Sequence, residues 1–384
     1  MTETVTNTND ATADVKETKD QINENSKEET KDTTETQTAV NEVAASAAAP
    51  TPVAPKGCRN PHYEKDIVYL FQFSRTPAIV SVSPFCLKVE TWLRLAGIKY
   101  ENVDHKMKYK SKKGQLPFIE LNGEEIADST FIIKELCLRF GKDLDSTLDN
   151  NQKNISHAMI SMIENHLLWV VNWWKIKYTD VMFKGYKINL QNFLGTRFPN
   201  SILNFFFKYK YRRVGLKKLK AHGIGVHTPE EIDQLGKNDL KVLSDMLGDK
   251  PYFFGDEPTN LDIVAFANLA QIYFVDKEVE YSLRDYLIEN FSNLVGHVNR
   301  MKERCFPDWD DICKTLDMNA HIQKPASEEK EVKSKDEEKK AEKEGDKIVD
   351  DKIEKEKDVD KEIDENKDKD KEKDTNKEDS KDSK

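Results

Sequence analysis

The chain has 384 residues and a formal net charge of −10, but its charge is unevenly distributed. Each end carries a net charge of about −6, which leaves about +2 for residues 57–319. A central segment this close to neutrality lacks the basic footprint that duplex nucleic acid requires, so we expect no nucleic-acid partner.

Both ends of the chain have the composition of disordered segments. Residues 1–60 are rich in Thr, Glu, Asp and Ala, and residues 318–384 are mostly Lys, Glu and Asp. Such segments bury too little apolar surface to offset the entropy that is lost on ordering. The sequence therefore predicts a disordered acidic tail over 1–60 and a disordered Lys/Glu/Asp-rich tail over 318–384, with the folded part between them.

Cysteine usage and hydropathy narrow the class of protein. The cysteines are scattered and none forms a CxxC pair, so a disulfide scaffold is not expected: Cys58, Cys86, Cys137, Cys305 and Cys313. The first residues lack the basic and apolar regions of a secretory signal. No stretch reaches the roughly 18 apolar residues of a membrane-spanning helix. We therefore expect a cytoplasmic protein without a transmembrane segment.

Residues 61–141 carry alternating strand and helix patterns. A buried strand is expected in "DIVYLFQF" at 66–73, a helix from Pro84 to about Ala96, and a second strand in "KYENVD". Asn122-Gly123 between two apolar runs predicts a β-hairpin, and a helix should follow from Ser129 to Phe140. This β-α-β-β-β-α order, with Pro117 opening the third strand, is typical of a thioredoxin-like α/β domain, in which the peptide before that proline is cis.

Residues 142–317 are predicted to form an all-helical domain. A long amphipathic helix is indicated by apolar residues at steps of three and four: Ile155, Met159, Met162, Ile163, Leu167, Val170 and Trp174. Glycines and a proline interrupt residues 178–226, so we expect an insertion of short helices and loops there. Two further helices are expected near residues 283–289 and 294–305.

Two capping motifs indicate where helices of the helical domain begin. Thr228 with Glu231, and Thr259 with Asp262, have the spacing of reciprocal caps at helix starts. The helix after Thr259, in "LDIVAFANLAQIYF", is apolar on nearly every side. A helix with that composition belongs at the centre of its domain.

Four stretches resemble the failed axon connections family, which is the metaxin-like branch of the glutathione transferase-fold superfamily: "SPFCLKVETWLRLAGIKYE", "SKKGQLPFIELNGEEIADS", "HGIGVHTPEEI" and "LGDKPYFFGDEPTNLDIVAF". The resemblance covers roughly residues 63–315 and excludes both tails. It implies a thioredoxin-like N-terminal domain, an all-α glutathione transferase-type C-terminal domain, and a cytoplasmic protein that acts in axon development.

Ser83 stands where thioredoxins keep the first cysteine of C-P-x-C. An alcohol cannot form a disulfide, so exchange between two cysteines is not expected at this motif. Two roles stay open for Ser83. It can cap the helix that Pro84 begins, or its hydroxyl can stabilise the thiolate of bound glutathione, as in serine-type transferases.

The resemblance also implies a glutathione site. Leu116 and Pro117 would present a strand-edge backbone to the cysteinyl amide, and Asp128 and Ser129 would hold the γ-glutamyl end at a helix start. The alternative for Asp128 and Ser129 is a plain helix cap. A lysine cluster is either a clamp for the glycyl carboxylate or a solvated loop: Lys106, Lys108, Lys110, Lys112 and Lys113.

Two functions follow as hypotheses. The first is a protein with glutathione as ligand or co-substrate, no required cofactor and at most weak transferase activity. The alternative is a non-catalytic scaffold with protein partners in axonal signalling or contacts to a membrane surface, suggested by the basic and aromatic run "FFFKYKYRRVGLKKLKAH". His222 with His227, and Cys58 with His62, do not complete a zinc ligand set, so we expect no metal. The sequence does not determine the oligomeric state.

Overall fold

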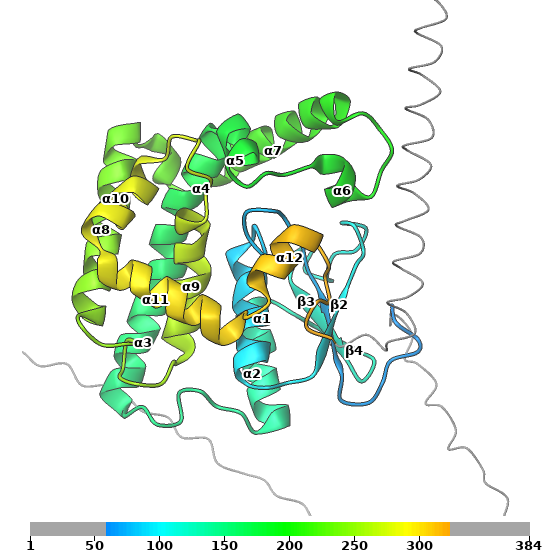
Figure 1. Ribbon diagram of the computed structural model, residues 1–384, viewed down its shortest axis with the longest axis vertical. Coiled ribbons are helices and arrows are strands. Elements are labelled where there is room, and N and C mark those ends of the chain that lie inside the picture. Colours follow the sequence, from blue (N-terminus) through cyan, green and yellow to red (C-terminus); the bar gives the residue numbers. More distant parts are fainter. Residues whose placement is uncertain (1–58, 323–384) are drawn as a thin grey trace, which may run out of the picture. The chain divides into compact units, whose positions relative to one another are not determined.

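The structure, a computed structural model, describes residues 59–322. It contains a four-stranded mixed sheet with two helices, followed by an all-helical part (Figure 1). This architecture confirms the predicted combination of a thioredoxin-like domain and an all-α domain. Most of the two predicted tails, residues 1–58 and 323–384, lies outside the described residues.

The sheet has the strand order β2-β1-β3-β4. Its strands are β1 (Val68–Phe71), β2 (Tyr100–Val103), β3 (Phe118–Leu121) and β4 (Glu124–Ala127). Strand β1 runs parallel to β2 and antiparallel to β3, and β3 forms a hairpin with β4. The hairpin turn places Asn122 at φ 51° and Gly123 at φ 82°, the left-handed region that an Asn-Gly turn favours.

The two helices of the sheet domain are α1 (Pro84–Leu95) and α2 (Ser129–Phe140). Pro84 at the first position suits a helix start, because proline has the right φ and lacks only a donor that would be unpaired there. Gly141 ends α2 in the left-handed conformation at φ 63°.

The helical part begins with one long run in three pieces. These are α3 (Asn150–Met162), the π-helical turn η1 (Ile163–Leu167) and α4 (Leu168–Lys177). Later helices are α8 (Pro229–Leu247), α9 (Asn260–Tyr273), α10 (Ser282–Asn290), α11 (Ser292–Cys305) and α12 (Trp309–Thr315). At the start of α8, Thr228 Oγ1 accepts from the N–H of Glu231, whose carboxylate accepts from the N–H of Thr228. At α9, Thr259 donates its N–H and its hydroxyl to Asp262.

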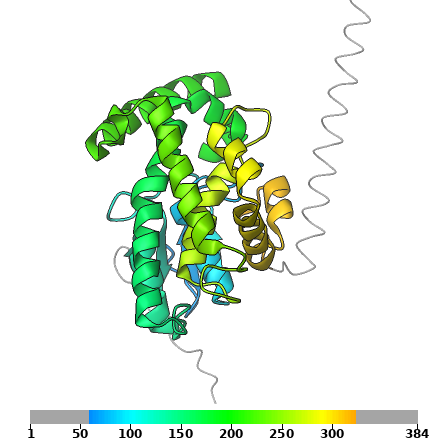
Figure 2. The same ribbon diagram turned by 90° about the vertical axis from the view of Figure 1, so that its left-hand side faces the viewer.

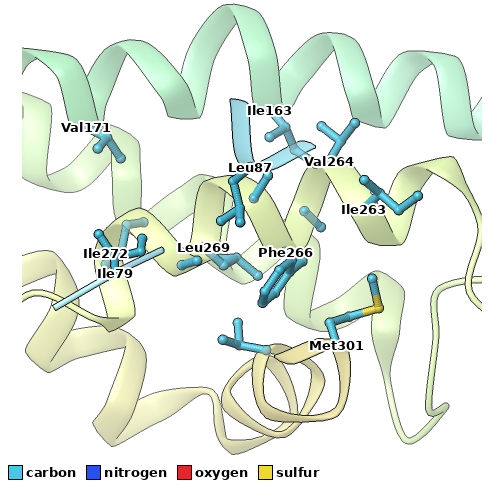
Figure 3. Close-up of a cluster of buried hydrophobic side chains, with 14 of the residues drawn as sticks. Ile79, Leu87, Ile163, Val171, Ile263, Val264, Phe266, Leu269, Ile272 and Met301 are labelled. Atoms are coloured by element: carbon cyan, nitrogen blue, oxygen red, sulfur yellow. The ribbon is translucent and has the colours of Figure 1, made fainter. Parts of the chain in front are cut away.

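Helix α9 lies at the centre of the core, as its composition predicts. Every residue from Leu261 to Ile272 is buried. Figure 3 shows Phe266 and Leu269 of α9 among Leu87 of α1 and Met301 of α11. Because α1 packs directly on α9, one continuous apolar core joins the two domains. Each large side chain buried there contributes about 1.5–3 kcal/mol relative to exposure.

The prediction of short helices and loops over residues 178–226 is only partly right. The segment contains α5 (Thr179–Gly185), α6 (Leu190–Leu194) and the short turn η2 (Ile224–Val226), but also the 23-residue helix α7 (Asn200–His222). Helix α7 lies at the top of Figure 1, and its green segment is seen from the side in Figure 2. It continues through Gly215, which lies against Ile176 of α4, where an added Cβ would stand 2.7 Å from Ile176 Cδ1. This glycine provides close packing and does not end the helix.

The inner ends of the predicted tails pack on the sheet domain. The side chain of Asn319 accepts from the N–H of Asn102 on β2 at 2.7 Å and donates to its carbonyl at 2.9 Å. The imidazole of His321 stacks on Tyr100 with ring centroids 4.2 Å apart. At the other end, Arg59 forms ion pairs with Glu120 and Glu125. The boundary predicted at residue 318 is therefore five residues too early for the described part, because residues 318–322 contribute specific contacts to β2.

Candidate functional site

A cavity of about 120 Å³ lies between the segment before β3 and the start of α2. Leu116, Pro117, Asp128 and Ser129 all border it, so the four residues predicted to bind glutathione come together. The Leu116-Pro117 peptide is cis, as expected for this fold. Phe85 of α1 and Glu164 of η1 complete part of the wall.

Asp128 forms the corner between β4 and α2. Its φ of 86° lies in the positive region, where aspartate and asparagine are enriched among non-glycine residues. Its Oδ1 accepts from the N–H of Thr130 at 3.0 Å and so caps α2. The corner leaves Ser129 as the first helical residue, where a backbone N–H has no partner within the helix.

Several polar groups at this cavity lack partners. Within residues 59–322, neither the N–H nor the C=O of Leu116 makes a hydrogen bond, and the hydroxyl of Ser129 makes none either. Backbone groups are almost always paired when they are withdrawn from water, so unpaired ones beside a cavity are available to a ligand. The donor and acceptor of Leu116 can pair with an extended peptide backbone in the manner of a neighbouring strand.

An ion pair joins the two domains at the cavity wall. Lys88 Nζ of α1 lies 2.8 Å from Glu164 Oε1 of η1 and donates to Thr130 Oγ1 at 3.1 Å. Neither Lys88 nor Glu164 is among the site residues predicted from the sequence. Lys88 lies one turn before the buried Trp92, and a lysine on the apolar face of a helix is the pattern that would have indicated it. Glu164 belongs to a π-helical turn, and such turns often occur at functional sites.

Ser83 does not border the cavity, although Phe85 does. Its Oγ accepts from the N–H of Cys86 at 3.4 Å, which makes Ser83 the N-cap of α1. Of the two roles that the sequence leaves open, this geometry provides the cap. Thiolate stabilisation by Ser83 stays a prediction.

The helical domain holds the loop that carries Ser83. Lys175 Nζ of α4 donates to the carbonyl of Val82 at 3.1 Å and to Gln271 Oε1 at 2.8 Å. Gln271 Nε2 of α9 donates to the carbonyl of Ser81 at 3.0 Å. Burial lowers the pKa of Lys175 to about 7. Two side chains from the C-terminal domain therefore fix the backbone just before α1.

The thiol next to this loop is buried. Burial raises the pKa of Cys86 to about 11. Because the thiolate is the nucleophile, a fully buried and protonated thiol is not suited to redox or transferase chemistry.

The predicted lysine cluster divides into separate contacts. Lys113 borders the cavity, and its Nζ stands 4.6 Å from the ring centroid of Phe131. Lys106 forms an ion pair with Asp104, and Lys112 donates its backbone N–H to Glu125. Lys113 is thus the member of the cluster that the structure places at the cavity.

Residues 59–322 contain neither a metal-binding cluster nor a membrane-spanning helix. That part of the chain contains no group of three or more His, Cys, Asp or Glu side chains arranged to hold a metal ion. His222 stacks on Trp169, and His227 contacts Glu231. None of the helices between residues 59 and 322 has the length and apolar character needed to cross a membrane.

Comparison with known proteins gives two family matches. A model described as the glutathione S-transferase N-terminal domain matches residues 84–181, and one described as the glutathione S-transferase C-terminal domain matches residues 236–301.

Three relatives are informative. Failed axon connections from Drosophila melanogaster is 62% identical over 297 residues, covering 76% of this chain and 71% of the relative. Isoprene-epoxide–glutathione S-transferase from Rhodococcus sp. (strain AD45) is 26% identical, covering 59% of this chain and 94% of the relative. Metaxin-2 from Mus musculus is 25% identical, covering 60% of this chain and 85% of the relative.

Proposed function

This chain belongs to the failed axon connections family, in the metaxin-like branch of the glutathione S-transferase fold, and from that premise we propose a specific function. It is a cytoplasmic protein of axon development that binds glutathione at the cis-proline cavity and has at most weak transferase activity. The proposal separates binding from catalysis, because the two depend on different residues.

The observation that carries the binding proposal is the unpaired backbone of Leu116 opposite the start of α2. Its N–H and C=O match the cysteinyl amide of glutathione. The free hydroxyl and the N–H of Ser129 suit the γ-glutamyl carboxylate, and the carboxylate of Asp128 suits the ammonium beside it. A relative whose name includes glutathione S-transferase lends support to this choice of ligand.

The same site argues against strong catalysis. A transferase must stabilise the glutathione thiolate, and the hydroxyl proposed for that role caps α1 outside the cavity. The cavity is also smaller than the roughly 300–1,000 Å³ of typical ligand pockets. The cavity therefore holds only part of the tripeptide, and the exposed side chains of Asp128 and Lys113 form its rim.

Calorimetry with glutathione tests this function. We expect Ser129→Ala to weaken binding about tenfold, because it removes a hydrogen bond to a charged group. The matched control is Ser146→Ala, an exposed serine outside the cavity, which should bind like the wild type. Absence of binding at millimolar glutathione, or equal affinity for the two variants, would contradict the proposal.

A second candidate function is a scaffold that contacts a membrane surface, and helix α7 favours it. Its outward side begins with exposed apolar residues, including Phe205 at 69% and Phe206 at 66% exposure. The helix has no acidic residue. From its middle onward it carries exposed cations: Lys210, Arg212, Arg213, Lys217, Lys218 and Lys220. Aromatic side chains next to cations are typical of helices that bind anionic bilayers.

Sedimentation with vesicles tests this candidate. The full chain should bind phosphatidylserine vesicles and not phosphatidylcholine vesicles, and Phe205→Ser with Phe206→Ser should abolish the binding. If binding is equal for both lipids, or absent, α7 is left as a surface for protein partners in axonal signalling.

A further inference from the structure

A second cavity lies wholly within the helical domain. It has a volume of about 440 Å³ and is enclosed by α4, α5, the start of α8 and the segment before α10. It shares no lining residue with the cis-proline cavity. Its volume falls within the roughly 300–1,000 Å³ of pockets that bind small molecules.

Aromatic rings form much of its wall. Trp174 stacks on Tyr281 with ring centroids 4.0 Å apart and an interplanar angle of 22°. Tyr178 meets Trp173 edge-on at 6.0 Å. Apolar side chains such as Val170 and Leu283 complete this surface. In the stacked pair each ring covers one face of the other, so only the ring faces left toward the cavity, which carry negative partial charge, can attract a cation.

The charged residues that line the cavity are all acidic: Glu230, Asp233 and Glu280. Asp233 already forms an ion pair with Lys237 at 2.6 Å. The side-chain carboxylates of Glu230 and Glu280 make no hydrogen bond or ion pair with any residue between 59 and 322. Two exposed carboxylates therefore stand unpaired beside an aromatic cavity.

The start of α8 at this cavity is unsuited to an anion. Pro229 has no N–H, and the N–H of Glu231 is used by Thr228. The glutamates in the first turn also offset the positive charge at this end of the helix dipole, which leaves less attraction for an anion. Lys177 places its ammonium 5.5 Å from the ring centroid of Trp173 but does not line the cavity, so the chain does not fill the space with its own cation.

We propose that this cavity binds a small organic cation, an alkylated or quaternary ammonium. The aromatic wall contacts the alkyl groups of the ligand, and Glu230 and Glu280 neutralise its charge from the rim. A quaternary ammonium suits this arrangement because it needs no hydrogen-bond acceptor and is attracted by ring faces. The site is independent of glutathione binding and rests on different elements.

Choline and its neutral isostere 3,3-dimethyl-1-butanol test the proposal with the full chain. The two probes share shape, so their difference in affinity, measured by calorimetry or by NMR titration, reports the charge alone. We expect choline to bind about tenfold more tightly than the alcohol. The combined Glu230→Gln and Glu280→Gln variant should reduce this preference to about threefold or less and leave the affinity for the alcohol unchanged.

Matched controls keep the test specific. Glu303→Gln changes an exposed glutamate on α11 that does not line the cavity, and it should retain the full preference for choline. Tyr178→Ala removes a half-exposed part of the wall and should weaken both probes. No binding of choline up to about 50 mM, equal affinity for the two probes, or an unchanged preference in the double variant would overturn the proposal.

Discussion

Replacing Lys175 by methionine tests how the helical domain holds the loop before α1. Lys175 is only 5% exposed, and its ammonium is bound by the carbonyl of Val82 and the amide oxygen of Gln271. No carboxylate within residues 59–322 forms an ion pair with it. Burial lowers its pKa from 10.5 to about 7. A buried ammonium without a carboxylate partner should therefore make stability depend on pH.

Whether the free energy of unfolding rises or falls with pH follows from how many protons the folded and unfolded states bind. The unfolded chain keeps this lysine protonated up to about pH 10, whereas the folded chain releases the proton near pH 7. Between these values the unfolded state binds more protons, so the free energy of unfolding rises with pH. For a folded pKa near 7, the rise from pH 7 to 8.5 amounts to about 1–2 kcal/mol.

Urea denaturation at the two pH values measures this rise. Lys175→Met keeps the apolar stem but has no titrating group, so it should lack the increase that the wild type shows. It also leaves two oxygens unpaired, at a cost of about 1–3 kcal/mol that does not change with pH. Other groups titrate alike in both proteins and cancel in the difference. If both proteins show the same pH dependence, Lys175 stays charged in the fold and the argument from burial is wrong.

Three further substitutions test the packing. Glu90→Gln should lower the free energy of unfolding, measured by urea denaturation, by about 3–5 kcal/mol. The reason is that buried Arg75, whose guanidinium nitrogens lie 2.7 Å from the carboxylate oxygens of Glu90, loses its charge partner. A loss below about 1 kcal/mol would contradict this. Gly215→Ala should destabilise the protein by about 1–3 kcal/mol despite the better helix propensity of alanine, because the new Cβ meets Ile176. Equal or higher stability would show that Ile176 moves aside. Thr228→Ala should cost about 1 kcal/mol through the lost cap of α8, and an unchanged melting temperature would refute that role.

Elements that depend on local patterns could be predicted from the sequence. The bounds predicted for α2, Ser129 to Phe140, are those observed, because Asp128 and Gly141 mark its two ends chemically. The hairpin at Asn122-Gly123 likewise depends on a turn type that few other dipeptides satisfy. The length of α7 cannot be predicted in this way, because glycine in a sequence indicates an interruption and the packing of Gly215 against Ile176 is visible only in three dimensions.

The candidate site likewise has parts that could be predicted from the sequence and parts that could not. Leu116, Pro117, Asp128 and Ser129 lie at the ends of neighbouring elements, so the topology of the fold brings them together. The ion pair of Lys88 with Glu164 joins residues 76 positions apart and exists only because the two domains pack on each other. The unpaired backbone of Leu116 cannot be inferred from composition, because it reflects where β3 begins.

Residues 318–322 cover the outer edge of strand β2. Strand β2 is an edge of the sheet, and an edge normally offers its free N–H and C=O groups to another strand. Here Asn319 occupies both backbone groups of Asn102, and His321 contacts the carbonyl of Tyr100 at 3.1 Å, much as a neighbouring strand would. Strand addition at this edge would first have to displace residues 318–322. The exposed aromatic and basic side of α7, in contrast, offers side-chain contacts that require no change at this edge.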